Sequence, residues 1–315
     1  MLKEVQEHKT RGRIKKVHLR PHAWNLHAPT HMEWSSDGRL YVSEHTSGTI
    51  RDITRGGDAS RSRPVARGLE GPAAVKPRQD GTLLVTETWG DRLSIVGPNG
   101  KRETIVEDLQ APYALGIVDP ERENEVIVSE SESLHLTRIL LIDLSKNQRR
   151  IILDKIPARH GEPGLARPGD WPDWERHAAA GCVKNWIDPL HPRYIHVAVG
   201  AMGQIIRVPK AKLENATPVS YADFISQAVE AVVVKGASVL GGIYYHEPDD
   251  HLYWLHPLAG ELMAAPAEGC LNVHFTPPLL RGLRGPTCVR PGLKPGTFFV
   301  CSSADGVVWE AAWSD

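Results

Sequence analysis

The chain has 315 residues, of which 41% are hydrophobic and 24% are charged, and it contains 28 glycines and 24 prolines. This composition is typical of a globular chain with many short elements joined by many turns. The formal net charge is -1, from 37 basic and 38 acidic residues, so no overall field attracts nucleic acid or an anionic membrane.

The N-terminal stretch contains no apolar run as long as a secretory signal, and no segment approaches the length of a membrane span. We therefore expect a cytoplasmic protein with no nucleic-acid partner and no membrane partner. Four cysteines are present without short paired spacing, which predicts buried free thiols and argues against a zinc knuckle or a disulfide framework: Cys182, Cys270, Cys288 and Cys301.

The first predicted element is a strand at residues 13–19, where apolar residues alternate with polar ones. From residue 28 onward a unit recurs, made of a corner, an apolar run, a turn and a second apolar run. Glu44, Glu87 and Glu130 end the second run of the first three units and lie at equal intervals of 43 residues. This spacing is typical of the blades of a β-propeller, which measure roughly 40 to 50 residues.

Proline marks the entry to four of the units, where it pre-sets the turn into an innermost strand. The corners are Ala28-Pro29, Gly71-Pro72, Ala111-Pro112 and Gly285-Pro286. Two further units, beginning near residues 181 and 239, keep the strand pattern without the proline. The last unit, residues 287–312, offers only three strands, so the strand at 13–19 is expected to complete it and close the ring.

We therefore predict an all-β fold, a single six-bladed β-propeller spanning residues 1–315, with a seven-bladed ring as the main alternative.

Two insertions interrupt the repeat. Residues 157–180 are expected to form a cover over the central mouth, because the connections between blades open on that face. Residues 210–228 are expected on the opposite face, where residues 221–230 have the pattern of a short amphipathic helix.

With its Asp-Gly turns and Gly-Pro corners, the chain resembles the superfamily of gluconolactonases, calcium-dependent phosphotriesterases and strictosidine synthase-like proteins, with NHL-repeat propellers close by. Residues 69–72, Leu-Glu-Gly-Pro, are similar to the corner through which gluconolactonase-like members supply a carboxylate to a central divalent metal. The resemblance implies Glu70 as a ligand and a divalent metal ion as the candidate cofactor. The family's other ligands are Asn or Asp after later corners, and here those positions hold poor ligands for a hard cation: Thr30, Tyr113, Gly181, Ser238 and Thr287.

The three evenly spaced glutamates should lie at matching places near the mouth. There, Glu44 is a candidate metal ligand, and Glu87 and Glu130 are candidate acid or base groups. The competing interpretation is that each glutamate hydrogen-bonds a loop of its own blade, since the same residue recurs at the same position.

Histidine supplies a second set of candidates, because imidazole is a common metal ligand and a natural base near neutral pH. We single out His31, His45 and His256 as catalytic candidates. Aromatic walls for a ligand are expected from Trp89, Tyr113, Trp171 and Trp174, and cationic contacts to an anionic ligand from Arg176 and Lys184.

These features predict an enzyme that transforms a small molecule in the propeller mouth by acid–base chemistry, with or without a metal ion. Ester or lactone hydrolysis is the first candidate because the resembling families suggest it. Lyase, isomerase or cyclase activity follows closely, and a non-catalytic NHL-type propeller that binds a protein partner is the alternative. The sequence leaves the oligomeric state open.

Overall fold

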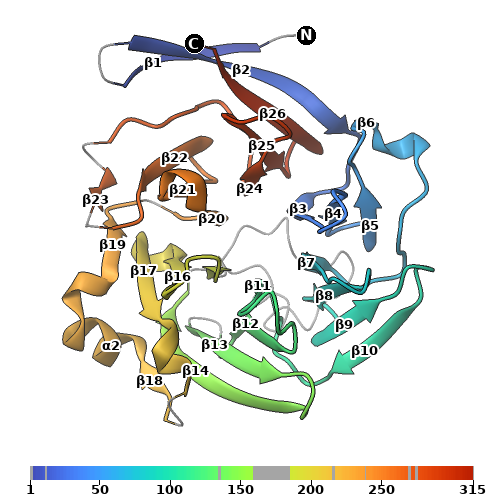
Figure 1. The fold of residues 1–315 in the computed structure, drawn as a ribbon, viewed down its shortest axis with the longest axis vertical. Helices are drawn as coiled ribbons and strands as arrows, with labels where there is room; N and C mark the ends of the chain where they lie inside the picture. Colours follow the sequence, from blue (N-terminus) through green and yellow to red (C-terminus); the bar gives the residue numbers. More distant parts are fainter. Residues whose placement is uncertain are drawn as a thin grey trace.

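A computed structural model describes residues 3–10, 13–133, 136–158, 185–214, 217–237, 239–268, 271–273 and 276–314. In these residues, six β-sheets stand around a central axis, and the strands of each sheet follow one another outward (Figure 1). The fold is a six-bladed β-propeller, as the repeat predicts, and the seven-bladed alternative is wrong. The described ends of the chain lie together at blade 6 (Figure 1).

The innermost strands, in the order of blades 1 to 6, are β3 (Pro29–Trp34), β7 (Pro72–Pro77), β11 (Leu115–Ile117), β15 (Trp186–Asp188), β20 (Ile243–His246) and β24 (Pro286–Pro291). The second strands are β4 (Leu40–Glu44), β8 (Leu83–Glu87), β12 (Glu125–Ser131), β16 (Tyr194–Val199), β21 (His251–His256) and β25 (Thr297–Ser302). The third strands are β5 (Thr49–Asp52), β9 (Arg92–Val96), β13 (Leu136–Asp143), β17 (Gln204–Pro209), β22 (Glu261–Pro266) and β26 (Val307–Ser314).

A fourth strand completes four of the blades: β10 (Arg102–Val106), β14 (Gln148–Pro157), β19 (Val232–Lys235) and, in blade 6, β2 (Arg13–Trp24). In blades 1 and 5 the described residues contribute a single bridge in its place, Ile50 with Ala66 and Leu262 with Leu280. Among the described residues, these two outer edges therefore carry an irregular segment.

The N-terminus closes the ring as predicted, because β2 pairs antiparallel with β26. The strand is longer than expected and continues to Trp24. A further strand, β1 (Lys3–Thr10), which the sequence analysis did not predict, pairs with β2 on its outer side. Blade 6 thus joins both ends of the chain and removes an open edge from the ring.

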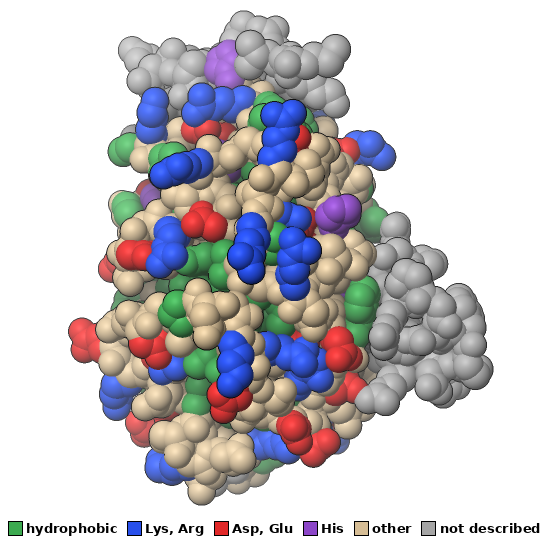
Figure 2. Space-filling view, turned by 90° about the vertical axis from the view of Figure 1, so that its right-hand side faces the viewer, with side chains coloured by type: hydrophobic (Ala, Val, Ile, Leu, Met, Phe, Trp, Pro, Cys, Tyr) green, Lys and Arg blue, Asp and Glu red, His purple; other side chains and the backbone are tan. Residues whose placement is uncertain are grey.

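Short parallel pairs fasten neighbouring blades at the rim. Each pair joins the fourth strand of one blade to a segment that follows the third strand of the next blade. The segments are β6 (Gly57–Asp58) on β2, β18 (Val219–Ser220) on β14, and β23 (Leu271–Asn272) on β19. On the rim of blades 1 and 2, acidic and basic side chains are interspersed, in keeping with the balanced net charge (Figure 2).

The core lies between blades, because both faces of each sheet pack against a neighbour. For this reason β4 and β8 are buried along their whole length, and their sequences are continuous apolar runs ending in a polar pair. Trp254 is fully buried in the cluster between blades 4 and 5, and Trp34 and Trp309 pack against other clusters.

Two predicted boundaries need correction or restriction. In the described residues the innermost strand of blade 4 spans Trp186–Asp188, and Gly181, near which this unit was predicted to begin, lies outside the described residues. Of the predicted cover at 157–180, only residues 157 and 158 are described.

The second insertion contains the predicted helix, α2 (Tyr221–Gln227), whose N-cap is Ser220. No helix in the described part of the chain is long and apolar enough to cross a bilayer.

Candidate functional site at the channel mouth

The innermost strands begin, and the second strands end, on the same face of the disc. Pro29 pairs with Glu44, Pro72 with Glu87, and Pro286 with Ser302. We call this side the corner face. As predicted, it carries the three repeated glutamates.

Each of these glutamates holds the corner of its own blade. Glu87 is fully buried, and its carboxylate accepts hydrogen bonds from the Glu70 backbone amide at 2.6 Å and from the Ser94 hydroxyl at 2.5 Å. Arg92 donates to both of its oxygens, at 3.1 and 2.9 Å. Burial alone would raise the pKa of Glu87, but the hydrogen bonds from Arg92 and Ser94 outweigh burial and lower it.

Blades 1 and 3 repeat this arrangement, which we call the corner clamp. Glu44 accepts from the His27 amide at 2.8 Å and from Arg51 at 2.5 Å. Glu130 accepts from the Gln110 amide at 2.8 Å and from Arg138 at 2.7 Å.

In blade 5 the two chemical groups of the clamp exchange places: the second strand supplies the nitrogen base and the third strand supplies the carboxylate. His256 occupies the position of the glutamate, and its Nδ1 lies 3.3 Å from the carboxylate of Glu261 on the third strand. Its Nε2 accepts from the Trp254 indole at 3.1 Å, so both ring nitrogens have partners. Burial lowers the pKa of His256, although Glu261 opposes this shift.

This geometry supports the interpretation that the repeated carboxylates bind loops of their own blades. Glu70 is also engaged, through a 2.9 Å ion pair with Arg92. In the part of the chain that the structure describes, no group of three or more His, Cys, Asp or Glu side chains is placed to hold a metal ion. The catalytic roles of Glu87 and Glu130, and the metal roles of Glu44 and Glu70, therefore stay untested predictions.

The residues on either side of Glu44 and Glu87 join one blade to the next, and the sequence analysis did not identify them. Thr86 accepts from the Ala74 amide at 3.0 Å and donates to the Tyr113 carbonyl at 2.7 Å. Thr88 donates to the Pro112 carbonyl at 2.8 Å. These neighbours recur at the same 43-residue interval as the glutamates, so the repeat could have identified them from the sequence.

His45 occupies in blade 1 the position that Thr88 has in blade 2. Its Nδ1 lies 3.3 Å from the Pro72 carbonyl, and because a carbonyl can only accept, the ring proton lies on Nδ1. Its Nε2 is buried without a hydrogen-bond partner in the described residues. The ring stands edge-on to Trp89, with centroids 4.7 Å apart, and burial lowers the pKa of His45 to about 4. His45 thus presents a neutral ring with an unused acceptor.

Three aromatic side chains meet at the axis of the channel. His31, from blade 1, stacks on Trp186, from the opposite blade 4, with centroids 6.2 Å apart and an interplanar angle of 16°. Tyr113, from blade 3, meets Trp186 edge-on at 5.2 Å. Burial raises the pKa of Tyr113, so its hydroxyl is a neutral donor, and it has no hydrogen-bond partner in the described residues. These three side chains form what we call the mouth floor.

Beyond the mouth floor, toward the opposite face, the six innermost strands contribute one residue each to a single layer. Each of these residues pairs with the residue three positions before the clamp position of its own second strand. In blade order the clamp position holds Glu44, Glu87, Glu130, Val199, His256 and Ser302. The residues of the layer are, in the same order, Glu33, Lys76, Gly116, Asp188, Tyr244 and Arg290. We call this layer the charge ring.

The charge ring holds His31 in place. Arg290 donates to Glu33 at 2.9 and 3.0 Å and approaches His31 Nε2 at 2.9 Å, while Lys76 forms an ion pair with Glu33. A guanidinium can only donate, so Nε2 accepts from Arg290, and the Val75 amide lies 3.5 Å from Nδ1. Burial, then Arg290 and Lys76, hold the pKa of His31 well below its usual range.

The predicted site residues are only partly brought together. His31 and Tyr113 lie in the mouth floor, and His45 and Trp89 lie beside each other between blades 1 and 2. His256 is part of a blade-internal pair in blade 5. Four predicted ligand-binding residues lie outside the described residues: Trp171, Trp174, Arg176 and Lys184. Trp186 contacts both His31 and Tyr113 and is the centre of the floor.

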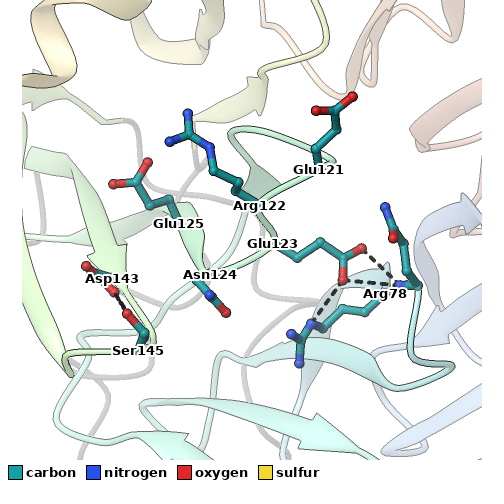
Figure 3. Close-up of a pocket in the computed structure, with 9 residues that line it drawn as sticks. Arg78, Glu121, Arg122, Glu123, Asn124, Glu125, Asp143 and Ser145 are labelled. Carbon is teal, nitrogen blue, oxygen red and sulfur yellow. Dashed lines mark hydrogen bonds and ion pairs between the residues drawn. The ribbon is translucent and has the colours of Figure 1, made fainter.

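An open pocket of about 420 Å³ lies on the opposite face, between the turns of blades 2 and 3 (Figure 3). Its walls are polar and largely exposed, and Glu123 spans it to reach Arg78 at 3.4 Å (Figure 3). It contains none of the mouth residues. A pocket with so little apolar wall is a poor site for a small organic molecule.

Several solved structures share this architecture at low sequence identity. Virginiamycin B lyase from Staphylococcus aureus is 10% identical, with a TM-score of 0.54, covering 94% of this chain and 99% of that chain. An auxiliary nutrient binding protein from Bacteroides thetaiotaomicron is also 10% identical, with a TM-score of 0.64, covering 98% of this chain and 79% of that chain. A luciferin-regenerating enzyme is 10% identical, with a TM-score of 0.60, covering 93% of this chain and 94% of that chain.

No protein-family model matches the sequence, and a search of curated proteins finds no match. At identities this low, the similar structures show the propeller fold alone. They support the predicted resemblance to six-bladed propellers and do not distinguish the gluconolactonase-like members among them.

Proposed function

We propose that this chain is an enzyme that binds a small planar organic molecule in the channel mouth and transforms it by acid–base chemistry of the elimination or isomerisation type. The observation that carries this proposal is the mouth floor, where His31, Trp186 and Tyr113 converge from three blades. Aromatic rings offer a flat ligand a large contact area, and the Tyr113 hydroxyl, which has no hydrogen-bond partner in the described residues, offers it a hydrogen bond.

The available groups suit proton transfer better than metal-assisted hydrolysis. Tyr113 is a neutral donor, and His45 has an acceptor nitrogen already oriented by its bond to Pro72. Elimination and isomerisation need one group to remove a proton and another to stabilise or protonate the product. Activation of water by a metal would need a ligand cluster, and the described residues supply none. Ester or lactone hydrolysis thus becomes the second reaction class.

The similar structures fit this proposal and one alternative. One is named as a lyase and one as a luciferin-regenerating enzyme, in agreement with small-molecule chemistry on this fold. Another is named as a nutrient-binding protein, which keeps a non-catalytic binding propeller as the alternative.

The first experiment is a thermal-shift screen of the full chain against planar lactones, esters and unsaturated cyclic compounds. Each ligand found is then incubated with the protein and followed by mass spectrometry. Cleavage or rearrangement without uptake of water supports the proposal, whereas a gain of water assigns the hydrolase class. A ligand that binds and returns unchanged supports the binding alternative.

Variants locate the activity. Tyr113→Phe and Trp186→Leu should abolish the thermal shift or the turnover, because they remove the donor and the stacking surface. Tyr194→Phe is the matched control, since Tyr194 starts β16 on the opposite face. His45→Thr copies Thr88 of the next blade and should lower turnover while leaving binding in place. Ligands whose shift survives both Tyr113→Phe and Trp186→Leu would place the site elsewhere.

A further inference from the structure

Two cysteines face each other across the inner strands of blade 6. Cys288 on β24 is directly opposite Cys301 on β25, and both are fully buried as free thiols. Side chains directly opposite in an antiparallel pair have Cβ atoms about 4.5–5.5 Å apart. A disulfide needs about 3.5–4.5 Å, so a small approach of the two strands is sufficient to form one.

The two thiols have different surroundings. Burial alone would raise the pKa of Cys288, but the hydrogen bond with Cys301 and the nearby Arg290 guanidinium lower it below its usual range. Burial and the same hydrogen bond raise the pKa of Cys301. Peroxides react with thiolates, and the sulfenic acid that forms condenses with a neighbouring thiol. Cys288 therefore has the character of the attacking thiol and Cys301 that of the resolving thiol.

Cys288 also links blade 6 to blade 1 beside the mouth floor. Its sulfur accepts a hydrogen bond from the Met32 amide at 3.4 Å and donates one to the Met32 carbonyl at 3.6 Å. Met32 directly follows His31, whose ring is held by Arg290 of the same strand as Cys288. The Cys288 thiol is thus one of the contacts that set the position of β24 against β3.

We propose that Cys288 and Cys301 form an oxidisable dithiol that a peroxide converts to a cross-strand disulfide. The Cys288 thiolate attacks one peroxide oxygen, breaks the O–O bond and becomes a sulfenic acid, and the other oxygen leaves as water after protonation. The Cys301 sulfur then attacks the sulfenic sulfur, and the hydroxyl leaves as a second water. Two thiols are oxidised and one hydrogen peroxide is reduced to two waters.

Formation of the disulfide removes the S–H group that donates to the Met32 carbonyl. It also draws the Cys288 sulfur toward β25 and away from the Met32 amide. The contact between β24 and β3 is then weaker, next to His31. This dithiol does not depend on the proposed function, since it requires only the two strands.

The test uses the full chain with Cys182→Ser and Cys270→Ser, so that only the pair can react. Hydrogen peroxide should lower the mass by two hydrogen atoms, and a non-reduced peptide map should join the peptides of Cys288 and Cys301. Dithiothreitol should restore the original mass. In the same samples, hydrogen exchange at the Met32 amide should be faster in the oxidised protein and return to its original rate after reduction.

A third substitution separates the two thiols. With Cys301→Ala added, peroxide should leave a sulfenic acid on Cys288 that dimedone traps, because no resolving thiol is present. The matched reference is Cys288→Ala, in which dimedone labelling should be lost. A folded protein that keeps both thiols free, or that passes to sulfinic acid without the linked peptide, would overturn the proposal. So would a disulfide that leaves exchange at Met32 unchanged, because the link to blade 1 would then be wrong.

Discussion

The corner clamps of blades 1 to 3 and the mouth floor use the repeat in opposite ways. In the clamps the same residue recurs, and Glu44, Glu87 and Glu130 each bind the corner of their own blade. In the floor the repeat is broken: the positions equivalent to His31 in blades 2 and 3 hold Ala74 and Ala114. A residue that recurs in successive blades stabilises the structure of its own blade, whereas a residue that departs from the repeat is the better candidate for a catalytic or binding role.

Glu87→Ala should have the largest effect on stability. It leaves Arg92 with fewer partners and removes the acceptor of the Glu70 amide, so we expect the free energy of unfolding to fall by about 3–5 kcal/mol. Urea denaturation measures this loss. The control is the exposed Glu103, whose change to Ala should stay within about 0.5 kcal/mol. Equal, small effects at both positions would show that the clamp contributes nothing to the fold.

Acid should weaken the fold through His45. Its pKa is about 4 in the folded chain, against about 6.5 when unfolded, so the unfolded state binds the extra proton. Stability should therefore decline as the pH falls from 6.5 to 4, by about 3 kcal/mol from this group. Denaturation curves across that range measure the decline. His45→Thr should reduce the slope by this group's share, because the lowered pKa values of His31 and His256 also contribute to the decline. An unaltered slope would mean that His45 is already accessible to protons.

Thr86→Val tests the bond between blades 2 and 3. The substitution keeps the shape and leaves the Ala74 amide and the Tyr113 carbonyl without their partner, which should cost about 2 kcal/mol. Thr104→Val on the outer strand of the same blade is the control, with an expected change within about 0.5 kcal/mol. Denaturant midpoints compare the two. If Thr104→Val proved the more harmful, the flanking hydroxyls would not be the inter-blade links inferred above.

Tyr113→Phe should have the smallest effect on stability, within about 0.5 kcal/mol, because its hydroxyl has no partner in the described residues. The same variant should lose the ligand response in the thermal-shift screen. A substitution in the mouth floor should thus leave the melting temperature without ligand unchanged and remove the thermal shift with ligand. A substitution in a corner clamp should lower the melting temperature itself. A large loss of stability in the absence of ligand would instead place Tyr113 among the structural residues.

Local signals were sufficient for most of the fold. Proline corners and Asp-Gly turns are formed within one blade, and the 43-residue interval separates equivalent residues of successive blades. Six blades could therefore be counted from the sequence. The clamp arginines could not be assigned in the same way. Arg51, Arg92 and Arg138 lie seven, five and eight residues after their glutamates, because a long side chain reaches the carboxylate from several backbone positions.

The sequence by itself determined the number of blades and the closure of the last one by β2, since an unpaired strand and an incomplete blade leave one solution. Only the tertiary structure decided which polar groups are already paired. Glu87 is neutralised by arginines that its spacing does not reveal, and His31 meets Trp186 across the axis only because the ring closes. Burial and pairing are properties of neighbours distant in sequence, and they place the candidate chemistry at the mouth floor.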